Sequence, residues 1–387
     1  MKYLVIGNGV AGISAAEAIR NSDKSAEITV LNSERYYHYS RPRVIEFLSG
    51  RTPLEKITIK NADFYEKNYI RLVMLVNVIK IDVIAKKVLL EGGIEEDYDR
   101  LIIAAGANSF MPPVPGSDYE GVFTLRTIDD AKAIMEYAKG KNTALLIGGG
   151  LLGIEAAMSL TALGLKTTIV EFFDRLLPRQ LDSEGAAMLK AKLEEKGLKF
   201  LLPRQTASIE KTAGGLKANF KDNTHAEAGL ILFSAGIRPN LKIIEGTGIL
   251  ADKGIKVNNY METSVRDVYA CGDITEYNGM VYGIWPAAKE QGTIAGQNAA
   301  GGRVEYKGSV LSTKLKVAGI ELGSLGSVEP GEGIEVYTEK TDAVFKRLYI
   351  KEGRLAGAIL LGDASAYQKL QEAMKNQVII KEPKSLL

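Results

Sequence analysis

Residues 2–12 read Lys-Tyr-Leu-Val-Ile-Gly-Asn-Gly-Val-Ala-Gly, and residues 143–153 repeat the pattern as Thr-Ala-Leu-Leu-Ile-Gly-Gly-Gly-Leu-Leu-Gly. Each copy consists of a short apolar run, a Gly-x-Gly-x-x-Gly motif and the start of a helix-forming stretch. A second apolar run follows each copy, at 27–31 and at 166–170. This order predicts two strand–helix–strand units that each bind a dinucleotide.

The glycine spacing explains why a dinucleotide fits these units. The first glycine makes the tight turn, the second lets the backbone approach a pyrophosphate, and the third lets the helix pack on the strand. The helix N-terminus then presents free N–H groups and a positive dipole end to the phosphates. An acidic residue closes each unit, Glu34 in the first and Glu171 in the second, where it can bind ribose hydroxyls. One glycine motif by itself indicates only a tight turn, whereas two copies, each between a strand and a helix, are specific for dinucleotide binding.

The composition excludes several classes of protein. The 387 residues include 49 Lys and Arg and 47 Asp and Glu, and the net charge of +2 does not favour nucleic acid or a membrane surface as a partner. The one cysteine, Cys271, cannot form a redox pair or a metal cluster, and two histidines exclude a multi-histidine metal site. No apolar run has the length of a membrane helix. We therefore expect a cytoplasmic protein that binds no metal, nucleic acid or membrane.

The sequence resembles the two-dinucleotide flavoproteins, the family of glutathione reductase and the ferredoxin and rubredoxin reductases. Residues 263–273, Thr-Ser-Val-Arg-Asp-Val-Tyr-Ala-Cys-Gly-Asp, are similar to the second FAD motif of that family. Residues 39–42, 109–116 and 315–319 are most similar to the NADH:rubredoxin oxidoreductases and the N-terminal part of nitrite reductases. The resemblance implies an α/β fold with two Rossmann-like domains of the glutathione-reductase type, one for FAD and one for NAD, and a small α+β C-terminal domain.

The resemblance also implies a division of the chain into three domains. The FAD domain is discontinuous, at 1–110 and 237–305, and the NAD(H) domain at 111–236 is inserted into it. The C-terminal domain covers 306–387, and its patterns predict strands at 311–318, 334–338, 344–350 and 354–361, a hairpin at Gly353 and a helix at 365–376. With about 80 residues it is shorter than the dimer-forming versions of relatives, which favours a monomer over a homodimer.

Contacts to FAD are carried over onto the positions that match the family's motifs. They lie at Gly7, Gly9, Val10, Ala11, Gly12, Asn32, Ser33, Glu34, Arg41, Pro42, Val78, Ala105, Gly106, Gly272, Asp273 and Trp285. Asp273 is expected to hold the ribityl and phosphate region, and Trp285 is expected either beside the flavin or in the core. Pro286 is suited to the first turn of a helix. Related ferredoxin reductases have a flavin-facing lysine four positions after the Arg-Pro pair, but Glu46 stands there in this chain.

The nicotinamide nucleotide is expected on the second unit, at Gly148, Gly150, Leu152, Gly153, Glu155, Glu171 and Gly236. Glu155 lies one turn into the helix, where relatives have a glutamate near the nicotinamide amide. Glu171 can bond a ribose 2′-hydroxyl and would repel a 2′-phosphate, so NADH is favoured over NADPH.

The missing cysteines bear on which flavoprotein activity the chain has. Disulfide reductases of the family need a cysteine pair, and its peroxidases and oxidases need a reactive cysteine around residues 38–48, but the chain has neither. Cys271 is expected to be a small buried residue. Hydride passes from nicotinamide C4 to flavin N5 without a general base, so we expect no catalytic side chain beyond Glu155 as a positioning group.

The interpretation that follows is an FAD-dependent oxidoreductase that takes hydride from NADH and passes single electrons to a small acidic iron–sulfur carrier such as rubredoxin or ferredoxin. An acidic carrier needs a basic rim, for which the candidates are Arg41, Arg43, Arg51, Lys314 and Lys316. Two alternatives stay open: an NADH oxidase that reduces oxygen directly, and a non-enzymatic flavoprotein that senses NADH.

Overall fold

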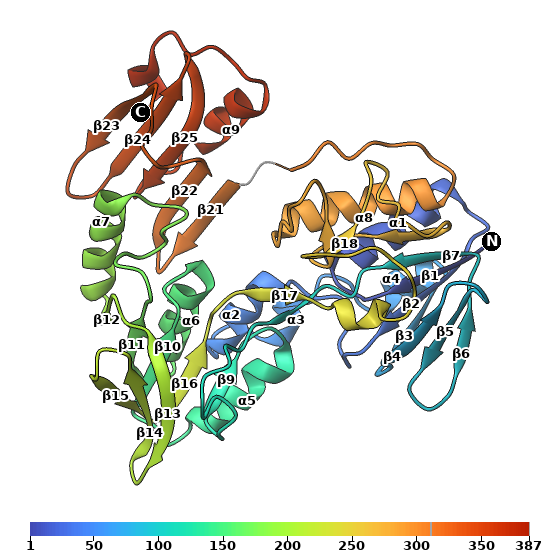
Figure 1. Cartoon of the computed structure of the whole chain (residues 1–387), viewed down its shortest axis with the longest axis horizontal. Helices are drawn as coiled ribbons and strands as arrows, with labels where there is room; N and C mark the ends of the chain where they lie inside the picture. The colour runs from blue at the N-terminus through green and yellow to red at the C-terminus, as the bar shows by residue number, and fades with distance from the viewer. Residues whose placement is uncertain (310–311, 387) are drawn as a thin grey trace. The chain divides into compact units, whose positions relative to one another are not determined.

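The computed structural model of the protein describes residues 1–309 and 312–386 (Figure 1). Contacts divide the chain into two compact units. The first unit comprises Met1–Val44, Thr52–Ser109 and Gly236–Ser309, and the second comprises Ile45–Arg51, Phe110–Ala235 and the described residues from 312 onward. The division into an FAD domain, an NAD(H) domain and a C-terminal domain stays a prediction.

A five-stranded sheet in the order β19-β7-β1-β2-β3 forms the centre of the first unit, and every neighbouring pair in it is parallel. The strands are β1 (Lys2–Ile6), β2 (Glu27–Asn32), β3 (Ile70–Met74), β7 (Arg100–Ile103) and β19 (Val268–Ala270). The central strand β1 is buried on both faces, which explains its continuous apolar run. Helix α1 (Val10–Ser22) connects β1 to β2, so the first predicted strand–helix–strand unit is confirmed.

Two helices of the first unit pack backbone to backbone. Helix α8 (Trp285–Ala299) begins with Pro286 in its first turn, as predicted, and lies against α1 (Figure 1). A Cβ atom on Gly292 would lie 2.2 Å from the carbonyl oxygen of Ala11, and one on Gly296 would lie 2.3 Å from that of Ala15. These two glycines therefore set how closely α8 approaches the helix of the first glycine motif.

Shorter elements complete the first unit. An antiparallel ribbon contains β4 (Val78–Asp82), β5 (Lys87–Leu90) and β6 (Glu95–Asp97), while β8 (Ala107–Ser109) pairs with β17 (Ile237–Pro239) and β18 (Ile255–Lys256) pairs with β20 (Thr275–Glu276). The short helices are η1 (Arg41–Arg43), α3 (Leu54–Ile57), α4 (Ala62–Lys67) and η2 (Leu241–Ile244), and α2 (Val44–Leu48) begins at the boundary between the units.

The second unit repeats the parallel sheet, in the order β12-β11-β10-β16-β9. Its strands are β9 (Val122–Thr124), β10 (Thr143–Ile147), β11 (Lys166–Val170), β12 (Lys199–Leu201) and β16 (Leu230–Phe233), and its helices are α5 (Ile128–Ala138), α6 (Leu151–Ala162) and α7 (Ser183–Glu194). Helix α6 connects β10 to β11, which confirms the second predicted strand–helix–strand unit. The strands β13 (Thr206–Thr212), β14 (Gly215–Phe220) and β15 (His225–Ala228) form a separate antiparallel sheet.

The C-terminal part of the second unit is an antiparallel sheet in the order β21-β22-β25-β24-β23 with one helix. Its elements are β21 (Ser312–Val317), β22 (Ile320–Gly326), β23 (Ile334–Lys340), β24 (Phe345–Lys351), β25 (Arg354–Leu361), α9 (Tyr367–Lys375) and η3 (Pro383–Leu386). The hairpin at Gly353 and the helix are confirmed; Leu311, where the first strand was predicted to begin, lies outside the described residues.

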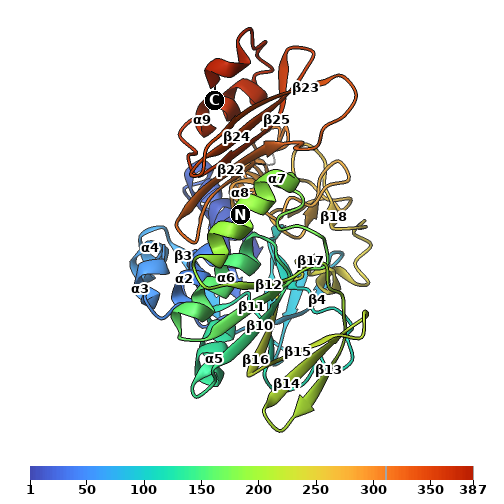
Figure 2. The same cartoon turned by 90° about the vertical axis from the view of Figure 1, so that its left-hand side faces the viewer.

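The four predicted strands are confirmed as β21, β23, β24 and β25, but the sequence did not predict β22, because the glycines of 319–326 made it resemble a turn. Gly323 is required within that strand, since a Cβ atom there would lie 2.8 Å from the ring of Tyr367 on α9. Figure 2 shows the sheet with α7 against it, and Arg347 of β24 pairs there with Asp182 and Glu184.

Among the described residues, no helix combines the length and the apolar character needed to cross a membrane.

Candidate functional site

The first glycine loop has one glycine that the protein's own packing does not explain. Gly7 has φ of +112°, and a Cβ atom there would lie 2.2 Å from the carbonyl oxygen of Ala104. A Cβ atom on Gly12 would lie 1.9 Å from the carbonyl oxygen of Gly7. Gly9, by contrast, has extended backbone (φ −75°, ψ −177°), and its Cβ atom would meet nothing within 4 Å. The space above Gly9 is therefore open to a ligand.

The second glycine loop repeats this geometry. A Cβ atom would lie 2.3 Å from the carbonyl oxygen of Ser234 if placed on Gly148, and 2.0 Å from that of Gly148 if placed on Gly153. Gly150 is again extended (φ −75°, ψ 177°) with open space beside it. A glycine at the cap position offers no side chain to the first N–H groups of α6, just as Gly9 offers none to α1. Both helix ends are thus suited to bind phosphate groups.

The acidic residue of the first unit lies in a polar cluster. Arg41 Nη2 is 2.5 Å from Glu34 Oε1, and the Tyr39 hydroxyl donates to Oε2 at 2.7 Å. The side chain of Asn32 accepts a bond from the backbone N–H of Glu34 at 3.2 Å. Burial alone would lower the pKa of Arg41, but the charges of Tyr39, Glu34 and Asp273 raise it. The structure therefore brings together Glu34, Arg41 and Asp273, which are distant in sequence.

The acidic residue of the second unit holds the backbone of its own loop. Glu171 is buried, its Oε2 accepts the N–H of Gly149, and its Oε1 accepts the N–H of Phe173 at 2.9 Å. Phe172 and Phe173 follow it with 58% and 51% of their surface exposed. The second acid is thus fixed beside the glycine loop and next to an exposed aromatic pair.

The second predicted FAD motif meets the first at α1. Gly272 has φ of +83°, and a Cβ atom there would lie 2.8 Å from the Cβ of Ala11. Its N–H donates to the side chain of Gln291 on α8 at 2.9 Å, and the half-buried Asp273 follows. Cys271 is fully buried, as predicted, and burial raises the pKa of its thiol to about 12. A thiol in this environment does not act as a nucleophile.

Trp285 lies beside a buried histidine that the sequence analysis missed. The rings of Trp285 and His38 stack at 5.9 Å between centroids. Nδ1 of His38 is 3.0 Å from the carbonyl oxygen of Asn8, and the Tyr65 hydroxyl donates to the side chain of Asn8 at 2.8 Å. Asn8 lies between Gly7 and Gly9, so this cluster supports the first loop. The two histidines of the chain are too few for a multi-histidine metal site and make a Ser-His-Asp triad improbable, and no local pattern predicts the stacking of His38 on Trp285.

The other predicted residues lie in several different elements. Ala105 and Gly106 follow β7, and Gly106 has φ of +65° with open space beside it. Val78 begins β4, while Leu152 is exposed in the first turn of α6. Gly236 belongs by its contacts to the first unit, unlike the other positions predicted for the nicotinamide nucleotide. The remaining predicted positions lie in α1, in η1 and after β2: Val10, Ser33 and Pro42.

The residues proposed for a basic rim are divided between the units. Arg41 and Arg43 belong to the first unit, whereas Arg51 and Lys314 belong to the second. Lys314 Nζ lies 5.5 Å from the centre of the Tyr367 ring, and the side chain of Lys316 lies outside what the structure describes. The rim as a single surface stays a prediction.

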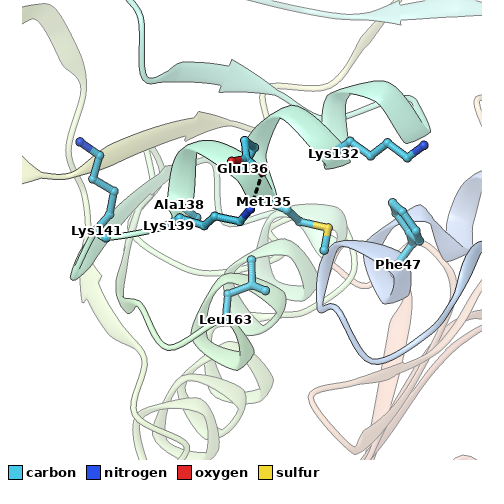
Figure 3. A pocket seen from close by; sticks show the side chains of 9 residues that line it. Phe47, Lys132, Met135, Glu136, Ala138, Lys139, Lys141 and Leu163 are labelled. Atoms are coloured by element: carbon cyan, nitrogen blue, oxygen red, sulfur yellow. Dashed lines mark hydrogen bonds and ion pairs between the residues drawn. The ribbon is translucent and has the colours of Figure 1, made fainter.

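A hollow of about 680 Å³ in the second unit is separate from the predicted residues (Figure 3). Figure 3 shows Phe47, Met135 and Leu163 as its apolar lining and an ion pair of Lys139 with Glu136, which measures 2.6 Å. None of the residues predicted to bind FAD or NAD lines it. The glycine loops, and not this hollow, are therefore the candidate site.

Comparison with known proteins covers almost the whole chain. Residues 1–292 match the family model of the pyridine nucleotide-disulphide oxidoreductases, and residues 312–378 match the rubredoxin NAD+ reductase C-terminal domain. The chain is 36% identical over 381 residues to an assimilatory nitrate reductase electron transfer subunit of Bacillus subtilis, covering 97% of this chain and 49% of that protein. It is also 36% identical over 373 residues to the NADH-rubredoxin oxidoreductase of Clostridium acetobutylicum, covering 96% and 94%. The chain thus spans about half the length of the first relative and nearly all of the second.

Solved structures agree with these sequence matches. The crystal structure of NADH:rubredoxin oxidoreductase from Clostridium acetobutylicum superimposes with a TM-score of 0.84 at 34% identity, covering 99% of this chain and 97% of that one. An NAD-dependent persulfide reductase from A. fulgidus gives 0.88 at 28% identity, covering 97% and 77%. Since the family model covers three quarters of the residues and a relative matches along nearly its whole length, the chain belongs to the pyridine nucleotide-disulphide oxidoreductase family.

Proposed function

We propose that this protein is an FAD-dependent oxidoreductase that oxidises NADH and passes the electrons to a small acidic iron–sulfur carrier such as rubredoxin. The observation that carries the proposal is the open space above Gly9 and above Gly150, two glycines that neither steric contact nor positive φ requires. A bound flavin accepts hydride from NADH and can release electrons singly, which is the chemistry that a one-electron carrier needs.

In the first unit, the chain offers a complete set of groups for FAD. The N-terminus of α1 would hold the pyrophosphate over Gly9, and Glu34 would bond the ribose, oriented by Arg41 and Tyr39. Asp273 would lie at the phosphate and ribityl region, because its charge already acts on Arg41. The N-terminus of α8, with Trp285 beside it, would stabilise negative charge on the flavin ring.

In the second unit, the same logic favours NADH. The N-terminus of α6 would hold the pyrophosphate over Gly150, and Glu171 would bond the ribose 2′-hydroxyl. A buried carboxylate at that place would repel a 2′-phosphate. The exposed Phe172 and Phe173 offer apolar surface for the adenine ring.

The nature of the acceptor is supported by the C-terminal part of the chain. Its match to the rubredoxin NAD+ reductase C-terminal domain and the similarity to a rubredoxin oxidoreductase favour a small iron–sulfur protein. The burial of Cys271 argues against the oxidases that need a reactive thiol. We also infer that the protein acts as a monomer in a reducing cytoplasm, where a single cysteine forms no disulfide.

An anaerobic two-step experiment tests the proposal. The FAD-loaded protein is mixed with NADH, the bleaching of the flavin is followed, and oxidised rubredoxin is then added. We expect fast bleaching, and then a return of the flavin colour together with loss of the rubredoxin colour. Bleaching without return would contradict the proposed acceptor, and the rate of oxygen consumption in air would then distinguish an oxidase from a sensor. No bleaching would contradict the whole proposal.

A further inference from the structure

Two glutamates of the second unit, Glu46 on α2 and Glu155 on α6, lie within electrostatic reach of one another. The buried hydroxyl of Ser159 on α6 donates to the carbonyl oxygen of Ile45 on α2 at 2.8 Å. Glu155 lies one helical turn before Ser159 on the same face of α6, and Glu46 follows Ile45 directly. This one hydrogen bond therefore places the half-buried Glu155 within electrostatic reach of Glu46.

The surroundings of Glu155 disfavour its charged form. Burial first, and then the negative charge of Glu46, raise the pKa of Glu155 from 4.5 to about 7. Among the described residues, β10, β11 and β21 also pack closely on α6. Of their lysines, Lys166 stands at the exposed start of β11, Lys314 lies over the Tyr367 ring, and the side chain of Lys316 is outside the described part. Near neutral pH, Glu155 is thus balanced between its two protonation states.

Because Glu155 lies near the N-terminus of α6, a nucleotide bound there would change the protonation of its carboxyl. Glu155 comes five residues after Gly150, whose open side would face the pyrophosphate. A nucleotide bound on this loop would cover the first turns of α6 and would remove water from the Glu155 carboxyl. Removal of water disfavours a carboxylate further, and Glu46 stays beside it as a like charge.

We propose that Glu155, with Glu46 beside it as a like charge, takes up a proton when NAD(H) binds at the second glycine loop, and that nucleotide affinity therefore falls as the pH rises above neutrality. The inference rests on the proposed function, because it assumes that the nucleotide binds over Gly150. It assigns a role to Glu46, which occupies the position of a lysine in related ferredoxin reductases.

Isothermal titration calorimetry tests the inference without turnover. NAD+ is titrated into the oxidised, FAD-loaded protein at several pH values from 6 to 9, in buffers that differ in ionisation enthalpy. We expect the measured heat to depend on the buffer between about pH 7 and 8.5, with uptake of up to one proton per nucleotide. The dissociation constant should rise by up to tenfold per pH unit in that range.

Variants identify the group that is protonated. Glu155→Gln should abolish the uptake, and Glu46→Gln should move it to lower pH, because the like charge is gone. Glu195→Gln, at an exposed position after α7, is the matched control and should behave as the wild type. If Glu155→Gln binds NAD+ too weakly to measure, the inference is tested by whether proton uptake moves to lower pH in Glu46→Gln.

The outcomes separate the two proposals. Binding of NAD+ without a buffer-dependent heat would overturn this inference and leave the proposed function standing. Uptake that persists in Glu155→Gln, or that does not move in Glu46→Gln, would overturn it as well. Absence of NAD+ binding at every pH would overturn both proposals.

Discussion

His38 shows how one buried side chain couples the first glycine loop to pH. Burial lowers the pKa of His38 to about 4, so the ring is neutral in the folded protein and its Nδ1–H donates to Asn8. In the unfolded chain the pKa returns to about 6.5. Between these values the unfolded state binds a proton that the folded state does not. The contribution of neutral His38 to the free energy of unfolding is therefore fully present above pH 6.5 and is lost as the pH drops toward 4.

We predict that the free energy of unfolding decreases between pH 7 and pH 4.5. The share of this decrease that comes from His38 is at most about 3 kcal/mol. Urea unfolding at each pH measures it. His38→Gln should lose that share of the pH dependence, whereas His225→Gln, on the exposed other histidine, should keep it. An equal pH dependence in all three proteins would contradict the assigned pKa.

Gly9 and Gly150 allow the two nucleotide sites to be blocked one at a time. Their extended backbone accepts any residue, so a valine should fold normally and fill the space above the loop. We predict that Gly9→Val is purified with little FAD. Gly150→Val should keep full FAD but bind NAD+ at least tenfold more weakly. The flavin-to-protein absorbance ratio and a binding titration measure both effects, and full FAD in Gly9→Val would refute the assignment of the first loop.

At the scale of elements, the contact between α1 and α8 depends on glycine. A methyl group on Gly292 would lie 2.2 Å from the carbonyl oxygen of Ala11, a backbone atom that can move only together with its helix. We predict that Gly292→Ala lowers the free energy of unfolding by about 3 kcal/mol. Gly214→Ala, at an exposed turn where a Cβ atom meets nothing within 4 Å, is the control and should change it by less than about 1 kcal/mol. Equal effects, measured by urea unfolding, would refute the close packing.

The C-terminal sheet is joined to α7 by charged groups. Arg347 on β24 bonds Asp182 and Glu184, and Asp182 also accepts the Tyr349 hydroxyl at 2.8 Å and caps α7 through the N–H of Gly185 at 2.8 Å. Asp182 thus serves the sheet and the helix together. The C-terminal residues and the second glycine loop belong to the same compact unit, and these bonds contribute to its cohesion.

At the scale of the whole molecule, the single tryptophan reports on one of the two units. Trp285 lies in the first unit, where FAD is proposed to bind. A ligand that binds only the folded state stabilises it by about 2.7 kcal/mol at one hundred times its dissociation constant. We predict that removing FAD lowers the urea midpoint of the Trp285 fluorescence transition and that added FAD restores it. Gly9→Val should gain nothing from added FAD, and a midpoint independent of FAD would contradict the location of the site.

Several parts of the site could not be predicted from local patterns. The stacking of His38 on Trp285 joins segments almost 250 residues apart, and no spacing rule connects them. In the sequence, Glu46 stands out only as a departure from the ferredoxin reductases, since its neighbour Glu155 is on another helix. The strand β22 was missed because Gly323 is there to admit Tyr367, a residue that becomes adjacent only in the folded sheet.

The sequence by itself determined the two strand–helix–strand units, their glycine loops and the acids that close them. These features depend on residues within about thirty positions of one another, where backbone sterics and apolar periodicity act directly. Only the tertiary structure decided which glycines are packed and which are open, how Arg41 is shared by Glu34 and Asp273, and which carboxylates meet in the second unit. Those properties arise from burial and from charges brought together by distant segments, and burial exists only once the chain has folded.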